Sequence, residues 1–288
     1  MARNDWRGGS LESNNPMALT LTAELAARMN RFYWDSAVLR ARLCEGLDGN
    51  PLGGSVQEFG HAVAIKYLDG GSIHANRVFG LGVDDLSPLD AILHFYREDG
   101  LRCDFQLNDQ SIEPETALRL AEKSLLVTRS ISTQYGVPTA APPPPLGVTV
   151  RRADGAVREE CFQLFMDVFE VSAEEREGIL LTERLENSQP GSHLYIALVD
   201  GVPAAAASMD IRDGIGHLTS GATLPQFRRR GCQAALIQRR LADALEEGCD
   251  LAVGNAMPYS GSRQNMERAG MRTALLGLKV TDCSSLPA

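Results

Sequence analysis

The sequence lacks the features that mark several large classes of protein. Its six cysteines are widely spaced, with no CxxC pair and no nearby histidine, which argues against a disulfide framework or a zinc site and favours free thiols in a reducing compartment. No run approaches the roughly 18 apolar residues that cross a membrane, and residues 1–17 contain no apolar signal-peptide core. We therefore expect a cytoplasmic protein with no metal ion and no membrane partner.

An excess of positive charge is also absent. The 288 residues include 28 Lys+Arg and 37 Asp+Glu, a net charge of -9, which argues against a nucleic-acid partner. A composition of 44% hydrophobic and 23% charged residues is typical of a soluble globular protein. Against this acidic background the three arginines at 228–230 form a local positive spot, which suits a small phosphorylated ligand better than a polyanion.

Proline is concentrated at one point in the chain. The stretch TAAPPPPL at 139–146 contains four consecutive prolines, which favour an extended conformation outside helices and sheets. We predict a linker at 137–147, the alternative being a proline-rich loop within one domain. The predicted divisions are a flexible tail at 1–17, an α/β domain at 18–136 and a second domain at 148–288.

Apolar periodicity and turn residues predict the secondary structure of both halves. In the first half we expect helices at 19–47, 88–98 and 114–124, and strands at 59–68, 72–81, 100–107 and 125–134, with a hairpin turn at 69–71. In the second half we expect strands at 148–152, 193–199, 202–211, 216–223, 250–257 and 275–281, and helices at 156–169, 174–187 and 262–269. A further helix is expected to begin at the turn that the following paragraph describes and to end at residue 247.

The stretch LPQFRRRGCQAAL at 224–236 joins a predicted strand to a predicted helix. A helix start exposes unpaired amides, and with the helix dipole these form an anion site. Gly231 leaves the amides unobstructed, and the arginines before it add forked donors suited to phosphate. From these residues alone, a pyrophosphate site and an ordinary basic loop remain equal alternatives.

Two blocks of the second half resemble the GNAT (general N-acetyltransferase) superfamily. RRRGCQ at 228–233 resembles the signature Gln/Arg-x-x-Gly-x-Gly/Ala, with Gln233 in place of the last Gly/Ala. PYSGSRQNMERAGM at 258–271 is similar to the Ser-x-x-Asn-x-Glu-Arg-x-Gly-Phe stretch of one branch. The resemblance covers residues 148–282 and implies an α/β (α+β) fold, a mixed central sheet flanked by helices. The first half has a similar rhythm without the cationic turn, as expected of a degenerate GNAT-like copy.

The resemblance implies acetyl-CoA as the cosubstrate. The family's pantetheine-binding strand end and pyrophosphate-binding turn match two segments here, and Asn265 matches a further cofactor contact. The implied cofactor-binding residues are Gly221, Ala222, Thr223, Arg229, Arg230, Gly231, Cys232, Gln233, Ala234 and Asn265.

The chemistry implied by the resemblance is direct attack of an amine on the thioester, which needs a proton acceptor. His217 lies where many members carry a basic glutamate, and an imidazole titrates near neutral pH; a structural histidine is the equal alternative. Met266 stands where the family often has the tyrosine that protonates the leaving thiolate. Tyr259 is our candidate for that role, with water as the alternative.

We therefore expect an acetyl-CoA-dependent N-acetyltransferase acting on a primary amine of a small molecule. The alternatives are a protein N-acetyltransferase and a non-catalytic CoA-binding sensor or partner protein. The expected partner is a small-molecule amine, and a homodimer is left open.

Overall fold

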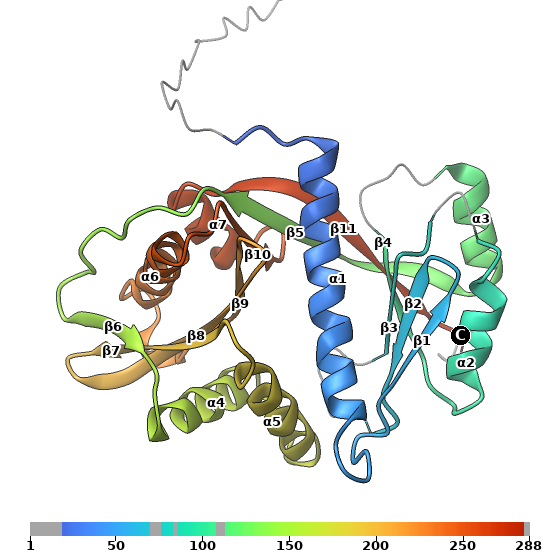
Figure 1. The fold of residues 1–288 in the computed structure, drawn as a ribbon, viewed down its shortest axis with the longest axis horizontal. Coiled ribbons are helices and arrows are strands. Elements are labelled where there is room, and N and C mark those ends of the chain that lie inside the picture. Colours follow the sequence, from blue (N-terminus) through green and yellow to red (C-terminus); the bar gives the residue numbers. More distant parts are fainter. Residues whose placement is uncertain (1–18, 70–75, 83–85, 108–112, 285–288) are drawn as a thin grey trace, which may run out of the picture.

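The computed structural model describes residues 19–69, 76–82, 86–107 and 113–284. The tail predicted at 1–17 and most of the turn predicted at 69–71 lie outside these residues. In the described chain one mixed sheet runs through the molecule in the order β1-β2-β3-β4-β11-β5-β10-β9-β8-β7-β6 (Figure 1). This arrangement confirms the predicted α/β fold with a mixed central sheet.

The bounds of most elements lie within a few residues of the prediction. The first half contains α1 (Ala23–Glu45), β1 (Ser55–Phe59), β2 (Ala62–Lys66), β3 (Arg77–Phe79), α2 (Leu89–Arg97), β4 (Asp104–Leu107), α3 (Pro114–Glu122) and β5 (Leu125–Gly136). The second half contains β6 (Val148–Arg152), α4 (Ala156–Val168), α5 (Ala173–Asn187), β7 (Ser192–Val199), β8 (Val202–Arg212), β9 (Ile215–Thr223), a short 3-10 helix (Pro225–Phe227), α6 (Cys232–Glu246), β10 (Leu251–Ala256), α7 (Gly261–Arg268) and β11 (Arg272–Asp282).

One predicted strand, 59–68, is wrong at its start. The chain turns at Gly60 and His61, so that β1 pairs antiparallel with β2 from Phe59–Ala62 outward. Gly60 has φ +62°, a left-handed conformation that glycine adopts readily. The pair Gly-His is not among the Asn-Gly and Asp-Gly sequences that mark two-residue hairpins. The sequence pattern therefore did not indicate this turn, and the strand predicted at 59–68 combined the last residue of β1 with β2.

The two halves repeat one order of elements. β1-β2-β3-α2-β4-α3-β5 corresponds to β7-β8-β9-α6-β10-α7-β11. In each half the third and fourth strands of this series are parallel neighbours, β3 with β4 and β9 with β10. The second half adds β6, α4 and α5 before the series, whereas the first half adds α1.

The last strand of each half lies in the other half's part of the sheet. β5 pairs antiparallel with β10, and β11 pairs antiparallel with β4. The two exchanged strands also pair with each other, from Tyr135–Arg272 to Leu125–Asp282, and Figure 1 shows them spanning both halves. Between β5 and β6 the chain is neither helix nor strand, as its prolines predict. The sheet nevertheless continues through both halves.

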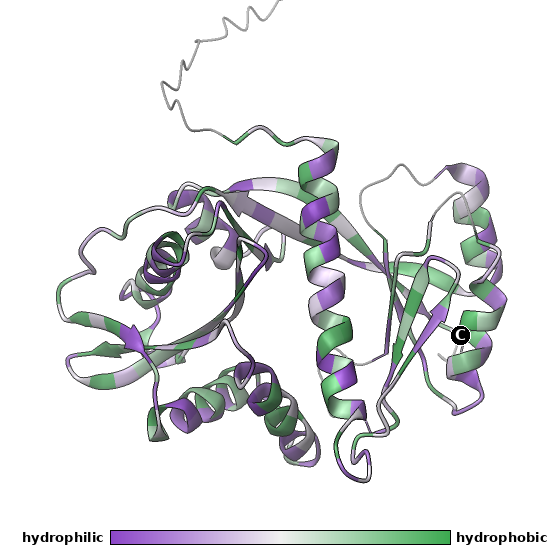
Figure 2. Cartoon of the chain, viewed as in Figure 1, coloured by the Kyte–Doolittle hydropathy of each residue, from purple (hydrophilic) through white to green (hydrophobic). Residues whose placement is uncertain are grey.

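Helix α1 packs between the halves and contacts both. Met29 and Phe32 pack with buried residues of β5, β9 and β10. Ala41 and Cys44 pack with β2 and β3, and this cluster extends to side chains of α5. In Figure 2 green apolar bands alternate with purple hydrophilic ones along the helix. One helix thus forms the wall that both halves share.

Candidate functional site

Strands β9 and β10 separate at the middle of the sheet. They pair in parallel from Ile215–Leu251 to Leu218–Gly254, after which no pairing between them continues. Beyond that point β9 still pairs with β8 as far as Thr223, and β10 still pairs with β5. The facing edges of residues 219–223 and 255–256 therefore present backbone amides and carbonyls to a gap, where an extended, amide-rich ligand can pair with them.

A bulge in β9 lies beside this separation. The β8–β9 register shifts between Ala207 and Met209, and the hydroxyl groups of Ser208 and Thr219 lie 2.6 Å apart across it. The carbonyl of Ser208 accepts a hydrogen bond from Arg240, whose guanidinium is buried beneath the strands. Burial lowers the pKa of Arg240 to about 10. The buried arginine thus satisfies a carbonyl at the irregular part of the ladder.

The predicted anion site lies at the start of α6. Gly231 is its N-cap, with φ +86°, and no side chain caps the helix. The first backbone N–H groups of the helix therefore have no side-chain acceptor and can donate to a ligand. Arg229 also has a left-handed φ of +62°. Arg230 lies 3.4 Å from Asp200, but both side chains are exposed, and such a pair holds the arginine weakly.

Two other predicted cofactor-binding residues contact each other next to this turn. Asn265 of α7 donates a hydrogen bond of 2.6 Å to the side-chain oxygen of Gln233 on α6. Arg268 donates to the side-chain oxygen of Asn265 at 2.9 Å. Cys232 is buried, and burial raises the pKa of its thiol. That direction favours a packing role over a reactive thiolate.

A cavity of about 440 Å³ lies between the two halves and reaches the separation of β9 and β10. At one end its lining includes Thr219 and Ser220 of β9 and Asn255 of β10. The rest of its lining comes from α1, β2, β3, β5, the end of α4, α5, β8 and β9: Tyr33, Ser36, Ala37, Arg40, Ile65, Tyr67, Arg77, Ile131, Phe169, Glu183, Glu186, Asn187, Ser208, Asp210, His217, Leu218, Ala256 and Met257.

His217 lies in the wall of this cavity and is 8% exposed. It contacts the rings of Phe32 and Tyr33 edge-on, at centroid distances of 5.6 and 6.1 Å. Among the described residues its Nδ1 has no hydrogen-bond partner. Burial lowers the pKa of His217 to about 4, although Asp210, opposite it on β8, acts in the other direction. The expectation that it titrates near neutral pH is therefore corrected: the buried ring is neutral at pH 7.

Comparison with known proteins shows a family to which the second half is similar. Residues 158–271 match the model of the acetyltransferase (GNAT) family. The C-terminal part of this chain is thus similar to the GNAT family. Among curated proteins, no sequence matches the chain.

Solved GNAT structures share the fold over most of the chain. A GCN5-related N-acetyltransferase from Kribbella flavida is 20% identical with a TM-score of 0.62, the alignment covering 85% of this chain and 95% of that one. A tandem GNAT protein from the clavulanic acid biosynthesis pathway is 12% identical with a TM-score of 0.61, covering 92% and 97%. A GCN5-related N-acetyltransferase from Sphaerobacter thermophilus is 17% identical with a TM-score of 0.58, covering 78% and 81%. At these identities the likeness concerns the fold.

The described GNAT residues fit an acyl-CoA. The uncapped amides of α6 suit a pyrophosphate, and the open edge of residues 219–223 suits an amide-containing arm. A Cβ at Gly231 would lie 2.7 Å from Cγ of Pro145, so the turn accepts only glycine without a shift. Through Pro145, the proline-rich segment packs directly against this turn.

The structure does not bring Tyr259 to the cavity. Its side chain is 93% exposed, and it is not among the lining residues. Met266, at the family's tyrosine position, is buried, and its methyl group would be 2.9 Å from a Cβ at Gly254. The position of the family tyrosine is therefore filled by packing at the point where β9 and β10 separate.

Sequence reasoning missed the polar residues on α5 and β8. Glu183, Glu186 and Asn187 have i, i+3, i+4 spacing, which places them on one helix face. That spacing was a usable signal, but on a helix with many charges it does not distinguish a cavity wall from a solvated surface. Asp210 gave no signal, since it is a single acidic residue near the end of a largely apolar strand.

No helix in the described part of the chain combines the length and apolar character needed to cross a membrane. All six cysteines are free thiols, as expected, and five of them are buried.

Proposed function

We propose that this protein is an acetyl-CoA-dependent N-acetyltransferase that acetylates a primary amine of a small molecule by direct attack. The observation that carries the proposal is the cavity that ends at the separation of β9 and β10, beside the uncapped start of α6. When bound, acetyl-CoA would supply an acetyl group activated as a thioester. The chain supplies binding, orientation and proton transfer.

We propose that two segments hold the cosubstrate. The backbone of Gly221, Ala222 and Thr223 pairs with its amide-containing arm. The amides of residues 231–234 bind its pyrophosphate, and Arg229 and Arg230 add charge. Asn265 supports this turn through Gln233, to which it already donates.

For the proton we propose His217 as the acceptor. The ring is neutral and its Nδ1 has no partner among the described residues, so in the tautomer protonated at Nε2 it can accept a hydrogen bond from an amine. With its pKa lowered to about 4 it is a weak base. Asp210 on the paired strand favours the protonated ring electrostatically. We propose water as the general acid, because Tyr259 lies on the surface.

The structure supports a small acceptor over a polypeptide. Helix α1 and helix α5 both line the cavity, and Arg40 of α1 forms an ion pair with Glu186 of α5. A polypeptide acceptor that crosses the cavity would need an open groove where this ion pair joins the two helices. The repeated order of elements supports the first half as a degenerate GNAT-like copy that walls the acceptor site. Free thiols throughout the chain favour a cytoplasmic location.

A non-catalytic CoA-binding protein is the second candidate. It is favoured by the buried Met266 at the tyrosine position and by the exposed Tyr259. Calorimetry with acetyl-CoA, followed by a thiol-release assay across a panel of small amines, separates the two. We expect binding, and amine-dependent thiol release. Binding without release for any amine would select the sensor, and no binding at millimolar acetyl-CoA would refute both.

A further inference from the structure

The end of the cavity next to α5 and β8 is rich in carboxylates. Glu183 and Glu186 of α5 and Asp210 of β8 face the cavity, against two lining guanidinium groups, Arg40 and Arg77. Arg40 is paired with Glu186. In the described chain neither Glu183 nor Asp210 has an ion-pair partner within 4 Å. This end of the cavity therefore holds two carboxylates whose charge the protein leaves without a paired cation.

The hydrogen bonds to these two carboxylates come from neutral groups. Ser192 donates to Asp210 at 2.7 Å, and the amide nitrogen of Asn187 donates to Glu183 at 3.3 Å. Burial and the nearby Asp210 both raise the pKa of Glu183, while Arg40 opposes them. A partly buried carboxylate with a like charge nearby is unfavourable until a cation joins it.

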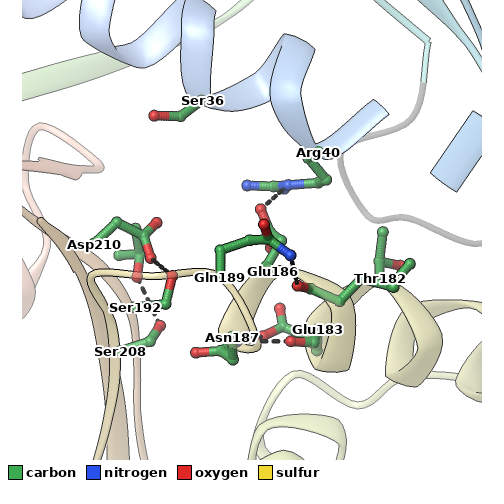
Figure 3. A network of polar contacts seen from close by, with 12 residues as sticks. Ser36, Arg40, Thr182, Glu183, Glu186, Asn187, Gln189, Ser192, Ser208 and Asp210 are labelled. Atoms are coloured by element: carbon green, nitrogen blue, oxygen red, sulfur yellow. Dashed lines mark hydrogen bonds and ion pairs between the residues drawn. The ribbon is translucent and has the colours of Figure 1, made fainter. Parts of the chain in front are cut away.

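A second, independent feature of this end is an unpartnered acceptor. Asn187 is 6% exposed, and its side-chain oxygen has no hydrogen-bond donor among the described residues. The orientation of the amide is fixed by its nitrogen, which donates to the backbone carbonyl of Glu183 at 2.8 Å as well as to its carboxylate. In Figure 3 Asn187 lies between Glu183 and the strands that carry Ser208 and Asp210.

We infer that Glu183, Asn187 and Asp210 bind a second, non-reacting ammonium group of the acceptor, so that the preferred substrates are diamines. This inference rests on the proposed function for the reacting amine. An ammonium group has three N–H donors and no acceptor, which matches two carboxylates and one amide oxygen. Charge-assisted bonds of this kind are about twice as strong as neutral ones.

The test compares pentane-1,5-diamine with pentan-1-amine, which lacks only the second ammonium group. Calorimetry on the full chain measures binding of each amine directly, and the thiol-release assay with acetyl-CoA measures transfer. We expect the dissociation constant and the KM of the diamine to be lower by about tenfold or more, as expected for one or two bonds to charged groups. Equal values for the two amines in the wild-type protein overturn the inference.

Variants then locate the site. Glu183→Gln and Asp210→Asn keep the shape of the side chain and remove its charge. The ratio of the KM of the monoamine to the KM of the diamine should therefore fall toward one. Glu177→Gln on the same helix is exposed and outside the cavity, and serves as the charge-matched control that keeps the preference. A Glu183→Gln protein that unfolds at the wild-type temperature and keeps the full preference refutes the assignment.

The two proposals fail in different ways. Diamine binding without thiol release for any amine refutes the transferase and supports the acidic site. Thiol release at equal efficiency for both amines supports the transferase and refutes the acidic site.

Discussion

Replacing Gly231 with alanine tests the anion site at the start of α6. Gly231 has φ +86°, and an L-residue in the left-handed region costs about 1–2 kcal/mol. In addition, the new Cβ would lie 2.7 Å from Cγ of Pro145, which is closer than such atoms approach, so the turn or the proline-rich segment must move. Backbone strain alone would lower the free energy of unfolding by about 1–2 kcal/mol, and we expect the clash to make the loss somewhat larger.

The same displacement affects ligand binding, because the amides of α6 follow Gly231 directly. Loss of one charge-assisted hydrogen bond to a phosphate costs about 1.5–3 kcal/mol, which corresponds to about a tenfold or greater rise in the dissociation constant of acetyl-CoA. Urea denaturation measures the stability and calorimetry measures the affinity.

Gly248, at the other end of α6, provides a matched control. Its φ is +79°, and a Cβ there would meet no atom within 4 Å. Gly248→Ala therefore carries the backbone strain without the clash and far from the turn. We expect it to lose about 1–2 kcal/mol and to bind acetyl-CoA normally. If Gly231→Ala also binds acetyl-CoA with the wild-type dissociation constant, the turn is not the pyrophosphate site.

Three further predictions concern protons, the exposed tyrosine and the exchanged strands. The pKa of His217 falls from 6.5 to about 4 on folding, so between these pH values the unfolded chain binds a proton that the folded chain does not. The contribution of His217 to the free energy of unfolding is therefore fully present above pH 6.5 and is lost as the pH falls toward 4. At about 1.36 kcal/mol per pH unit, the loss reaches about 3 kcal/mol. His217→Gln should flatten this slope in urea titrations at pH 4.5 and 7, and an unaltered slope would contradict the buried neutral ring. Tyr259→Phe should keep kcat and KM, whereas a fall of about a hundredfold in kcat would indicate a general acid. Residues 1–147 and 148–288 expressed separately should not unfold cooperatively, while coexpression should restore the sheet; a cooperative melt of either half alone would show that it does not need the exchanged strand.

Most of the fold could be predicted because it depends on local patterns. The meander of β7, β8 and β9 turns at Asp200-Gly201 and Asp213-Gly214, where both residues of each pair have positive φ. Such pairs mark two-residue hairpins in any sequence. The turn at Gly231 was predicted for the same reason, since strand, glycine and helix follow one another along the chain.

The exchange of β5 and β11 could not be predicted, because pairing partners depend on contacts between distant segments. β5 carries apolar and polar residues in an order that suits several neighbours, and nothing in its sequence distinguishes β10 from β4. The same limit applies to the cavity. Tyr33, Glu183 and His217 are distant in sequence and meet only through the packing of α1 and α5 on the strands. Burial, which sets the pKa of His217, was likewise invisible in its strand pattern.

The exchanged strands also determine how the cavity is held. β5 and β11 pair along their length and each pairs again with the opposite half, so hinging the halves apart would break backbone ladders on both sides. Each such bond contributes about 1 kcal/mol. Helix α1 adds Arg28, which donates two bonds of 2.7 Å to Asp250. The wall that carries Arg40 is therefore fixed relative to the strands that carry Asp210. A fixed wall keeps Arg40 paired with Glu186 and out of ion-pair distance of Glu183 and Asp210, so these two carboxylates stay available to the second ammonium group and the KM of the diamine should stay below that of the monoamine.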